Sequence, residues 1–255
     1  MASFKVYVRR PLYLYVSTFM NFNVLMGKRS LGQAHWKDYT QWAEDLLRQN
    51  VDSENVAILA NLGLEQSSDS EEIEFYFQKA MDDCDLTLPT ERDALSAYAR
   101  YICEQVVHGT MAPNEGLDTL QGFYAISGYE PIYSIWDELS EDIWLVNDRE
   151  EPVFNTGLTK DNQEEYIMNV AAQFLELLEI DLPDWFFLLF ACPACGYIGK
   201  SGFERIDKPW LPEKTFKLIY RRDPARRTVC AKCGAPFPKS MGDYEGRTQY
   251  LQSLY

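Results

Sequence analysis

The chain of 255 residues carries one short pattern twice near its end, as Cys192-Pro193-Ala194-Cys195-Gly196 and as Cys230-Ala231-Lys232-Cys233-Gly234. Thirty-four residues separate the inner cysteines of the two copies. A gap of two residues lets both thiolates of a pair face one tetrahedral ion, and the glycine suits a turn whose backbone N–H groups point toward sulfur. The pattern therefore predicts one structural Zn2+ with Cys192, Cys195, Cys230 and Cys233 as its ligands.

These two knuckles resemble the zinc-ribbon family, and the resemblance covers residues 192–234 only. Members of that family occur in transcription factors, RNA polymerase subunits, ribosomal proteins and adaptors. The resemblance thus implies a metal and a small β fold without implying an activity. Four thiolates leave no open position for water, which argues against a catalytic zinc. A dithiol redox role needs one pair at a helix start, which two facing knuckles do not provide.

The segment between the knuckles has the composition of short β-strands. We expect strands at residues 202–206, 215–220 and 227–229, with a turn at residues 209–212. Such a three-stranded ribbon is too small to fold without its ion.

The rest of the chain has the periodicity of α-helices. Apolar residues recur every three or four positions, and capping residues or prolines precede the repeats. Helices are expected to begin near Asp38, Ser53, Ser68, Thr90, Pro113 and Pro131, with a further one over residues 160–179. The predicted fold is mainly α, a multi-helix N-terminal array followed by a small C-terminal β zinc ribbon.

Charge is distributed unevenly along the chain. Residues 1–191 hold 12 Lys/Arg against 33 Asp/Glu, whereas residues 192–255 hold 12 Lys/Arg against 6 Asp/Glu. We therefore expect an acidic helical domain at residues 1–184 and a basic zinc-ribbon domain at residues 185–255. The apolar run at residues 185–190 is expected to pack the ribbon onto the helices, and an exposed partner-binding strip is the alternative.

Residues 1–30 fit either a strand or a buried helix, and the sequence leaves the choice open. The uncharged run at residues 12–27 resembles a signal peptide superficially, but it is polar in places and too short to span a bilayer. Four of the six cysteines belong to the knuckles, and Cys84 and Cys103 fit buried helix positions. Cysteines that serve as metal ligands or buried residues, and not as disulfides, predict a cytoplasmic protein, and we expect no membrane partner.

Basic and aromatic residues alternate in and beside the second half of the ribbon. Cations interleaved with aromatic rings suit phosphate contact and base stacking, so residues 200–232 are a candidate nucleic-acid surface. The candidate contacts for nucleic acid or for a protein partner are Lys217, Tyr220, Arg221, Arg222, Arg226, Arg227 and Lys232. The acidic body, by contrast, repels a polyanion at long range and would attract a basic protein.

Candidates for acid–base chemistry are few. No phosphate-binding glycine loop, nucleophile elbow, H-E-x-x-H motif or kinase motif set is present. Glu104 and His108 lie one helical turn apart, although a histidine in the last turn is also favoured by the helix dipole. The acidic pairs Glu71-Glu72, Glu141-Asp142 and Glu164-Glu165 are interpreted as solvated residues at helix starts.

Three hypotheses of function follow from these observations. The first is a non-enzymatic zinc-binding protein that acts on a protein partner as an adaptor, inhibitor or immunity-type factor. The alternative is a nucleic-acid-binding regulator that uses the basic ribbon. The third is a hydrolase with Glu104 and His108 in a helical cleft. The sequence indicates neither the oligomeric state nor the identity of the partner.

Overall fold

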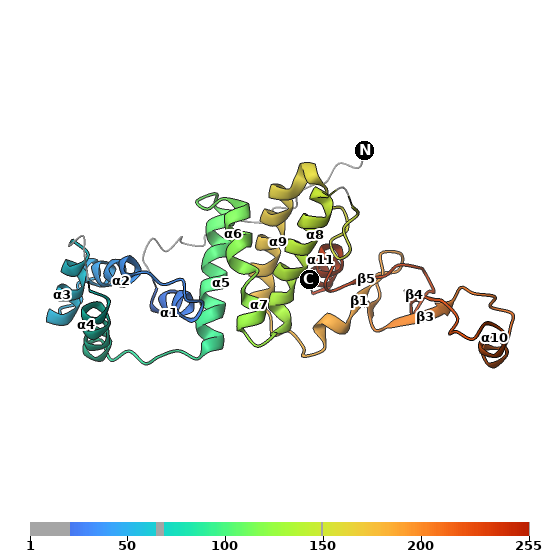
Figure 1. The fold of residues 1–255 in the computed structure, drawn as a ribbon, viewed down its shortest axis with the longest axis horizontal. Helices are drawn as coiled ribbons and strands as arrows, with labels where there is room; N and C mark the ends of the chain where they lie inside the picture. The colour runs from blue at the N-terminus through green and yellow to red at the C-terminus, as the bar shows by residue number, and fades with distance from the viewer. Residues whose placement is uncertain (1–20, 65–68, 149, 255) are drawn as a thin grey trace. The chain divides into compact units, whose positions relative to one another are not determined.

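The structure, a computed structural model, describes residues 21–64, 69–148 and 150–254. The protein is mainly α-helical, as predicted, with small antiparallel sheets near the C-terminus (Figure 1). Backbone contacts divide the chain into an N-terminal unit, residues 1–98, and a C-terminal unit, residues 99–255. The boundary expected between residues 184 and 185 rests on charge and stays a prediction.

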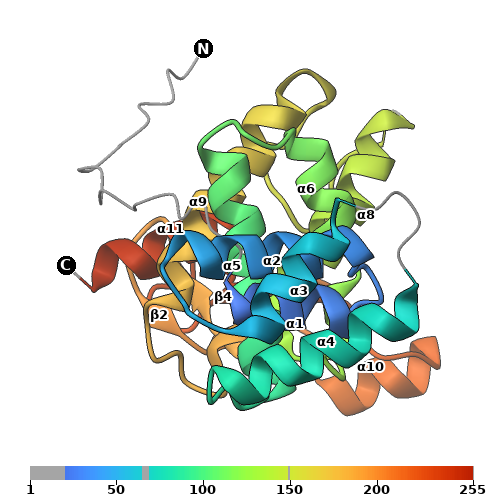
Figure 2. The ribbon, with the colours of Figure 1, turned by 90° about the vertical axis from the view of Figure 1, so that its left-hand side faces the viewer.

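The N-terminal unit is a cluster of short helices around an aromatic core. Its helices are α1 (Phe22–Ser30), α2 (Trp36–Arg48), α3 (Glu54–Leu62), α4 (Ser70–Asp83) and the first half of α5 (Glu91–Val107). Helices α2, α3 and α4 contact one another, and α1 contacts α2 (Figure 2). Trp42 of α2 and Phe77 of α4 are both buried, and their ring centroids lie 5.3 Å apart. The part of residues 1–30 that precedes Asn21 lies outside the described residues.

Helix starts in this unit follow the capping residues of the sequence. The Ser53 hydroxyl accepts from the Val56 N–H at 3.1 Å, and Thr90 Oγ1 accepts from the Asp93 N–H at 3.1 Å. These bonds satisfy N–H groups that have no partner within the helix. The expected cap at Ser68 lies outside the described residues, and the structure shows Asp69 as the cap of α4.

Replacing Phe77 by alanine is expected to lower the free energy of unfolding by about 3–5 kcal/mol, because it opens a cavity in a packed aromatic core. Phe75, on the same helix, is 55% exposed, whereas Phe77 is 0% exposed. The matched Phe75→Ala change should therefore alter stability by only about 0.5 kcal/mol. Urea unfolding of both variants measures the difference, and equal losses would contradict the assignment of this core.

The C-terminal unit combines a helical bundle with the cysteine-containing segment. After the second half of α5, its helices are α6 (Pro113–Leu120), α7 (Phe123–Ile126), α8 (Ser134–Asn147), α9 (Gln163–Leu178), α10 (Glu213–Tyr220) and α11 (Tyr244–Ser253). Short 3-10 helices, η1 (Pro131–Tyr133), η2 (Lys160–Asn162) and η3 (Phe186–Leu188), lie between them. Helix α6 contacts α8 and α9, and α11 contacts α9.

One helix expectation in this unit needs correction. The helix expected from Pro113 to the residues before Gly128 is interrupted at Gln121-Gly122 and forms α6 and α7. Glycine weakens a helix interior, which accounts for the interruption. At the C-terminus, α11 has 10 residues.

The β structure forms two separate antiparallel sheets. Strand β1 (Phe190–Ala191) pairs with β2 (Ile198–Gly199) on one side and with β5 (Lys239–Ser240) on the other. Strand β3 (Ser201–Arg205) pairs with β4 (Arg226–Cys230), from Ser201 opposite Cys230 to Arg205 opposite Arg226. We call residues 190–240, from β1 to β5, the cysteine module.

The strand expected at residues 215–220 is wrong, because this segment belongs to helix α10. Phe216 and Tyr220 are spaced one helical turn apart, and their rings pack at a centroid distance of 4.6 Å. Glu213 and Lys217 have the same spacing and form an ion pair of 3.2 Å, which supports a helix further. The other two expected strands correspond to β3 and β4.

The apolar run before the first knuckle packs partly on α11, which also contacts β1. Phe186 is buried, and its ring lies 4.9 Å from that of Tyr250. Trp185 and Leu188 remain exposed. The run is thus buried at Phe186 and exposed at Trp185 and Leu188, so it is neither a fully packed segment nor a fully exposed strip.

Candidate metal centre

Both cysteine knuckles have the same backbone geometry. In the first, the Gly196 N–H donates to the Cys192 carbonyl at 2.9 Å, and Gly196 has a φ of +67°. In the second, the Gly234 N–H donates to the Cys230 carbonyl at 2.9 Å, and Gly234 has a φ of +74°. A positive φ is unfavourable for residues with a side chain, so the glycine of each C-x-x-C-G pattern allows the turn to close.

The two knuckles bring their four sulfurs together. All four lie within 4.8 Å of one another, with Sγ–Sγ distances of 3.6 Å between Cys192 and Cys233 and 3.7 Å between Cys195 and Cys230. Tetrahedral coordination at a metal–sulfur distance of about 2.3 Å places sulfurs roughly 3.8 Å apart. A disulfide requires about 2.0 Å. The cluster therefore has the dimensions of a four-thiolate metal site.

The chemistry of the sulfurs also fits a bound cation. Burial raises the pKa of Cys230, but the backbone N–H groups of Cys233 and Lys232, together with the Cys192 and Cys233 thiols, outweigh it and lower this pKa to about 6. For Cys233, the Ala235 N–H lowers the pKa, but the neighbouring sulfurs and burial raise it overall to about 12. Four adjacent thiolates repel one another, and a cation at their centre removes that repulsion.

Arg205 and Lys232 are basic residues that lie near the knuckles in the sequence. The guanidinium of Arg205 donates to the Leu211 carbonyl and lies 4.7 Å from the Phe216 ring centroid. The backbone N–H of Lys232 lies 3.4 Å from Cys230 Sγ. A main-chain N–H group is therefore in contact with a sulfur of the cluster, and this contact does not depend on the side chains of Arg205 and Lys232.

Most of the predicted basic contact residues are paired with carboxylates of the same module. Lys217 pairs with Asp223 at 2.5 Å and with Glu213 at 3.2 Å. The remaining pairs join Arg222 to Asp207 at 2.7 Å, Arg226 to Glu213 at 2.8 Å, and Arg227 to Glu204 at 2.6 Å. These carboxylates would repel a phosphate that approached the cations.

The other three predicted contact residues differ in their surroundings. The Tyr220 hydroxyl accepts a hydrogen bond from Lys208. Arg221 ends α10 in the left-handed conformation, with a φ of 54°. The side chain of Lys232 is exposed next to the second knuckle. The structure therefore does not gather the seven predicted residues into one free cationic surface.

Glu104 and His108 do not form an enclosed site. His108 is exposed, and its Nδ1 lies 2.6 Å from the Glu104 main-chain oxygen, so the ring contacts the backbone of its own helix. Burial is the main cause that raises the pKa of Glu104. Within residues 21–64, 69–148 and 150–254, the four cysteines are the only group of three or more potential metal ligands. Glu104 and His108 are thus not part of a second metal site of this kind.

Neither of the remaining cysteines has the setting of a reactive thiol. Cys103 is fully buried in α5, and burial raises its pKa well above the ordinary value. Burial also raises the pKa of Cys84, and Asp83 and Asp85 add to the effect. Cys103 has the buried helix position that the sequence indicated, whereas Cys84 is half-buried at the C-cap of α4.

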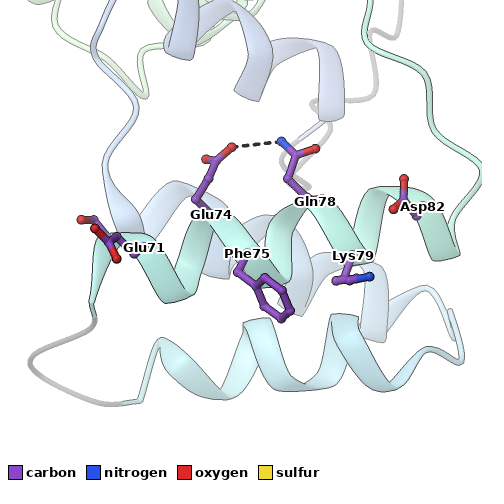
Figure 3. Close-up of a pocket in the computed structure, with 7 residues that line it drawn as sticks. Glu71, Glu74, Phe75, Gln78, Lys79 and Asp82 are labelled. Atoms are coloured by element: carbon purple, nitrogen blue, oxygen red, sulfur yellow. Dashed lines mark hydrogen bonds between the residues drawn. The ribbon is translucent and has the colours of Figure 1, made fainter.

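A shallow hollow of about 610 Å³ lies along the outer face of α4 (Figure 3). All of its lining residues belong to this one helix. Its Glu74 carboxylate is bound by Arg29 at 2.7 Å and by Gln78 at 3.0 Å, and these bonds lower the Glu74 pKa. The hollow is an open helix surface, and its Glu74 and Gln78 side chains are hydrogen-bonded.

Two buried polar residues of the C-terminal unit were not identified from the sequence. Asp142 was interpreted as a solvated residue at a helix start, but it lies inside α8, is fully buried, and accepts hydrogen bonds from the loop at residues 153–155. Arg247 of α11 is also fully buried. No pattern distinguishes these residues from the many exposed charges of the chain, because their burial depends on tertiary packing.

Comparison with models of protein families, with curated proteins and with solved structures returned no match for this chain. The fold and the site define a mainly α-helical protein with a four-cysteine cluster that could hold a metal ion. No helix among the described residues has both the length and the apolar character needed to cross a membrane.

Proposed function

We propose that this protein is a non-enzymatic, zinc-stabilised interaction protein whose cysteine module binds a protein partner. The observation that carries the proposal is the exposed apolar surface of the module. Leu218 and Ile219 are adjacent on the outer face of α10, and Leu218 is 80% exposed. Trp210, just before α10, is 77% exposed. Large apolar side chains left in water on a small module are typical of a protein contact surface.

The charges of the module favour a protein over a nucleic acid. Four of the predicted phosphate contacts, Lys217, Arg222, Arg226 and Arg227, have carboxylates within 3.2 Å. Leu218 and Ile219 are aliphatic and offer no flat surface for base stacking, so of the three apolar residues named above only Trp210 could stack on a base. The net charge of −15 also opposes a polyanion at long range.

Zinc is the metal that the site and the composition favour. Tetrahedral sulfur sites bind zinc or iron, and a site with no open position suits the redox-inert ion in a structural role. A cytoplasmic location, where thiols stay reduced, is consistent with free cysteines. Within this setting the roles of adaptor, inhibitor and immunity-type factor all fit, and the acidic N-terminal region would favour a basic partner.

The proposal predicts that Leu218→Asp combined with Ile219→Asp abolishes partner binding without loss of metal. Each new carboxylate would be desolvated at the apolar contact, so affinity should fall by on the order of 100-fold or more. Leu88→Asp is the matched control, because Leu88 is 65% exposed but lies outside the module. Affinity purification from the native host with the wild type and both variants, quantified by mass spectrometry, measures the change. A partner retained by the α10 variant would contradict the proposal.

The nucleic-acid alternative has its own test. Fluorescence anisotropy with labelled DNA and RNA, at low and moderate salt, should show no submicromolar binding. Salt-sensitive binding that is lost when Arg221→Glu is combined with Arg222→Glu would favour the alternative.

A further inference from the structure

The C-terminal helix α11 is attached directly to the fold of the cysteine module. Strand β5 pairs with β1, and Cys192 follows β1 in the chain. The same strand β5 continues through Met241 into α11. The Met241 N–H donates to the Leu189 carbonyl at 3.2 Å, just before β1. The position of α11 therefore depends on the β1–β5 pair that leads into the metal centre.

Helix α11 also lies against β5 without an intervening side chain. Gly246 is buried, and a Cβ added to it would lie 2.0 Å from the Ser240 carbonyl oxygen and 3.0 Å from the Lys239 carbonyl oxygen. These are backbone atoms of β5, so they cannot rotate away as a side chain would. A displacement of β5 must therefore displace α11 or break this contact.

A buried guanidinium depends on the same segment. Arg247 of α11 is 0% exposed, and its Nε donates to Gln173 Oε1 of α9 at 2.6 Å. Its Nη1 donates to the carbonyls of Met241 and Gly242, at 3.1 and 2.5 Å. Burial lowers the Arg247 pKa to about 10, so the side chain stays charged at neutral pH. Two of the three acceptors of this buried charge belong to the residues that follow β5.

We propose that metal in the four-cysteine site keeps α11 docked on α9, and that loss of the metal releases α11. Small metal modules lose their fold with the ion, so metal loss removes the β1–β5 pair and moves the Met241 and Gly242 carbonyls. A buried charge that loses its acceptors is strongly destabilising, and Arg247 regains hydration only if α11 leaves. Release uncovers the face of α9 that carries Gln173. The C-terminal helix is thus a metal-responsive element, whether or not the module binds a partner.

Hydrogen exchange of the full-length protein tests this proposal. Samples are compared with zinc bound, after chelation under reducing conditions, and after zinc is restored. Amides of α11 should exchange on the order of tenfold faster without metal and recover when zinc returns, while α2 and α3 keep their protection. The proposal fails if α11 stays protected while the cysteine module exchanges. It also fails if α6 and α8 lose protection to the same extent as α11, since the metal would then support the whole unit.

A glycine variant tests the attachment with the metal still bound. Gly246→Ala should increase exchange in α11 while the protein retains one equivalent of zinc and the first knuckle stays protected. Gly122→Ala is the matched control, because its Cβ meets only the Thr119 carbonyl oxygen, at 4.0 Å. An α11 that is as protected in Gly246→Ala as in the wild type would overturn the proposed contact. The chelation experiment does not depend on the folding of any variant.

Discussion

Cys192→Ser is expected to abolish stable metal binding and to unfold the cysteine module. Cys192 is buried, and its sulfur lies 3.6 Å from that of Cys233 within the four-sulfur cluster. Loss of a residue that only hydrogen-bonds to a metal ligand already lowers metal affinity 10- to 100-fold. Loss of a ligand itself should weaken affinity by about 100-fold or more. Because binding energy is folding energy in such modules, the fold between the knuckles should be lost as well.

Metal analysis of the purified variant, together with proteolysis at the exposed Arg221, measures both effects. Cys84→Ser serves as the control, because Cys84 lies at the end of α4 and is not part of the cluster. The control should keep the metal and the resistance to protease of the wild type. A Cys192→Ser protein with a full equivalent of tightly bound metal would contradict the assignment of ligands.

Asp142→Ala is expected to lower the free energy of unfolding of the C-terminal unit by about 3–5 kcal/mol. The Asp142 carboxylate accepts from the N–H groups of Val153, Phe154 and Asn155, at 2.6, 2.9 and 2.6 Å. It also accepts from Asn155 Nδ2 at 3.0 Å. Alanine leaves these donors without an acceptor. The two donors of Asn155 are buried, and each buried unsatisfied donor costs about 1–3 kcal/mol.

The matched control for Asp142 lies on the same helix. Asp137 of α8 is exposed, and Asp137→Ala should change stability by only about 0.5 kcal/mol. Denaturant unfolding should be monitored through hydrogen exchange in α8. The chain has two units, and this signal reports the stability of the C-terminal unit alone. Similar losses for both variants would show that the buried carboxylate does not hold the loop.

The cysteine cluster could be predicted because its determinants are local. Each knuckle needs only two cysteines at fixed spacing and a glycine that adopts a positive φ, as Gly196 and Gly234 do. The same holds for the caps at Ser53 and Thr90, whose hydrogen bonds span three residues. Features encoded within one turn of the chain are therefore read correctly from the sequence.

Helix α10 shows where the reasoning from periodicity failed. The segment at residues 215–220 alternates polar and apolar residues from Thr215 to Leu218, as a strand does, but Phe216 and Tyr220 also fit one face of a helix. In so short a run the two periods cannot be separated. The ion pair between Glu213 and Lys217 was the additional signal for a helix.

Asp142 and Arg247 show a second limit, which concerns long-range packing. Asp142 is bound by a loop eleven to thirteen residues away, and Arg247 contacts Gln173, 74 residues earlier in the chain. Neither separation has a sequence signature. The role of α11 in the C-terminal unit therefore became visible only when the structure placed these groups side by side.

X-ray absorption spectroscopy of the purified protein tests the central claim most directly. A divalent metal bound by Cys192, Cys195, Cys230 and Cys233 should give a spectrum of zinc with four sulfur neighbours at about 2.3 Å. Metal analysis of the same sample should give one equivalent per chain. A folded protein without metal, with the four cysteines oxidised to disulfides, would contradict the account.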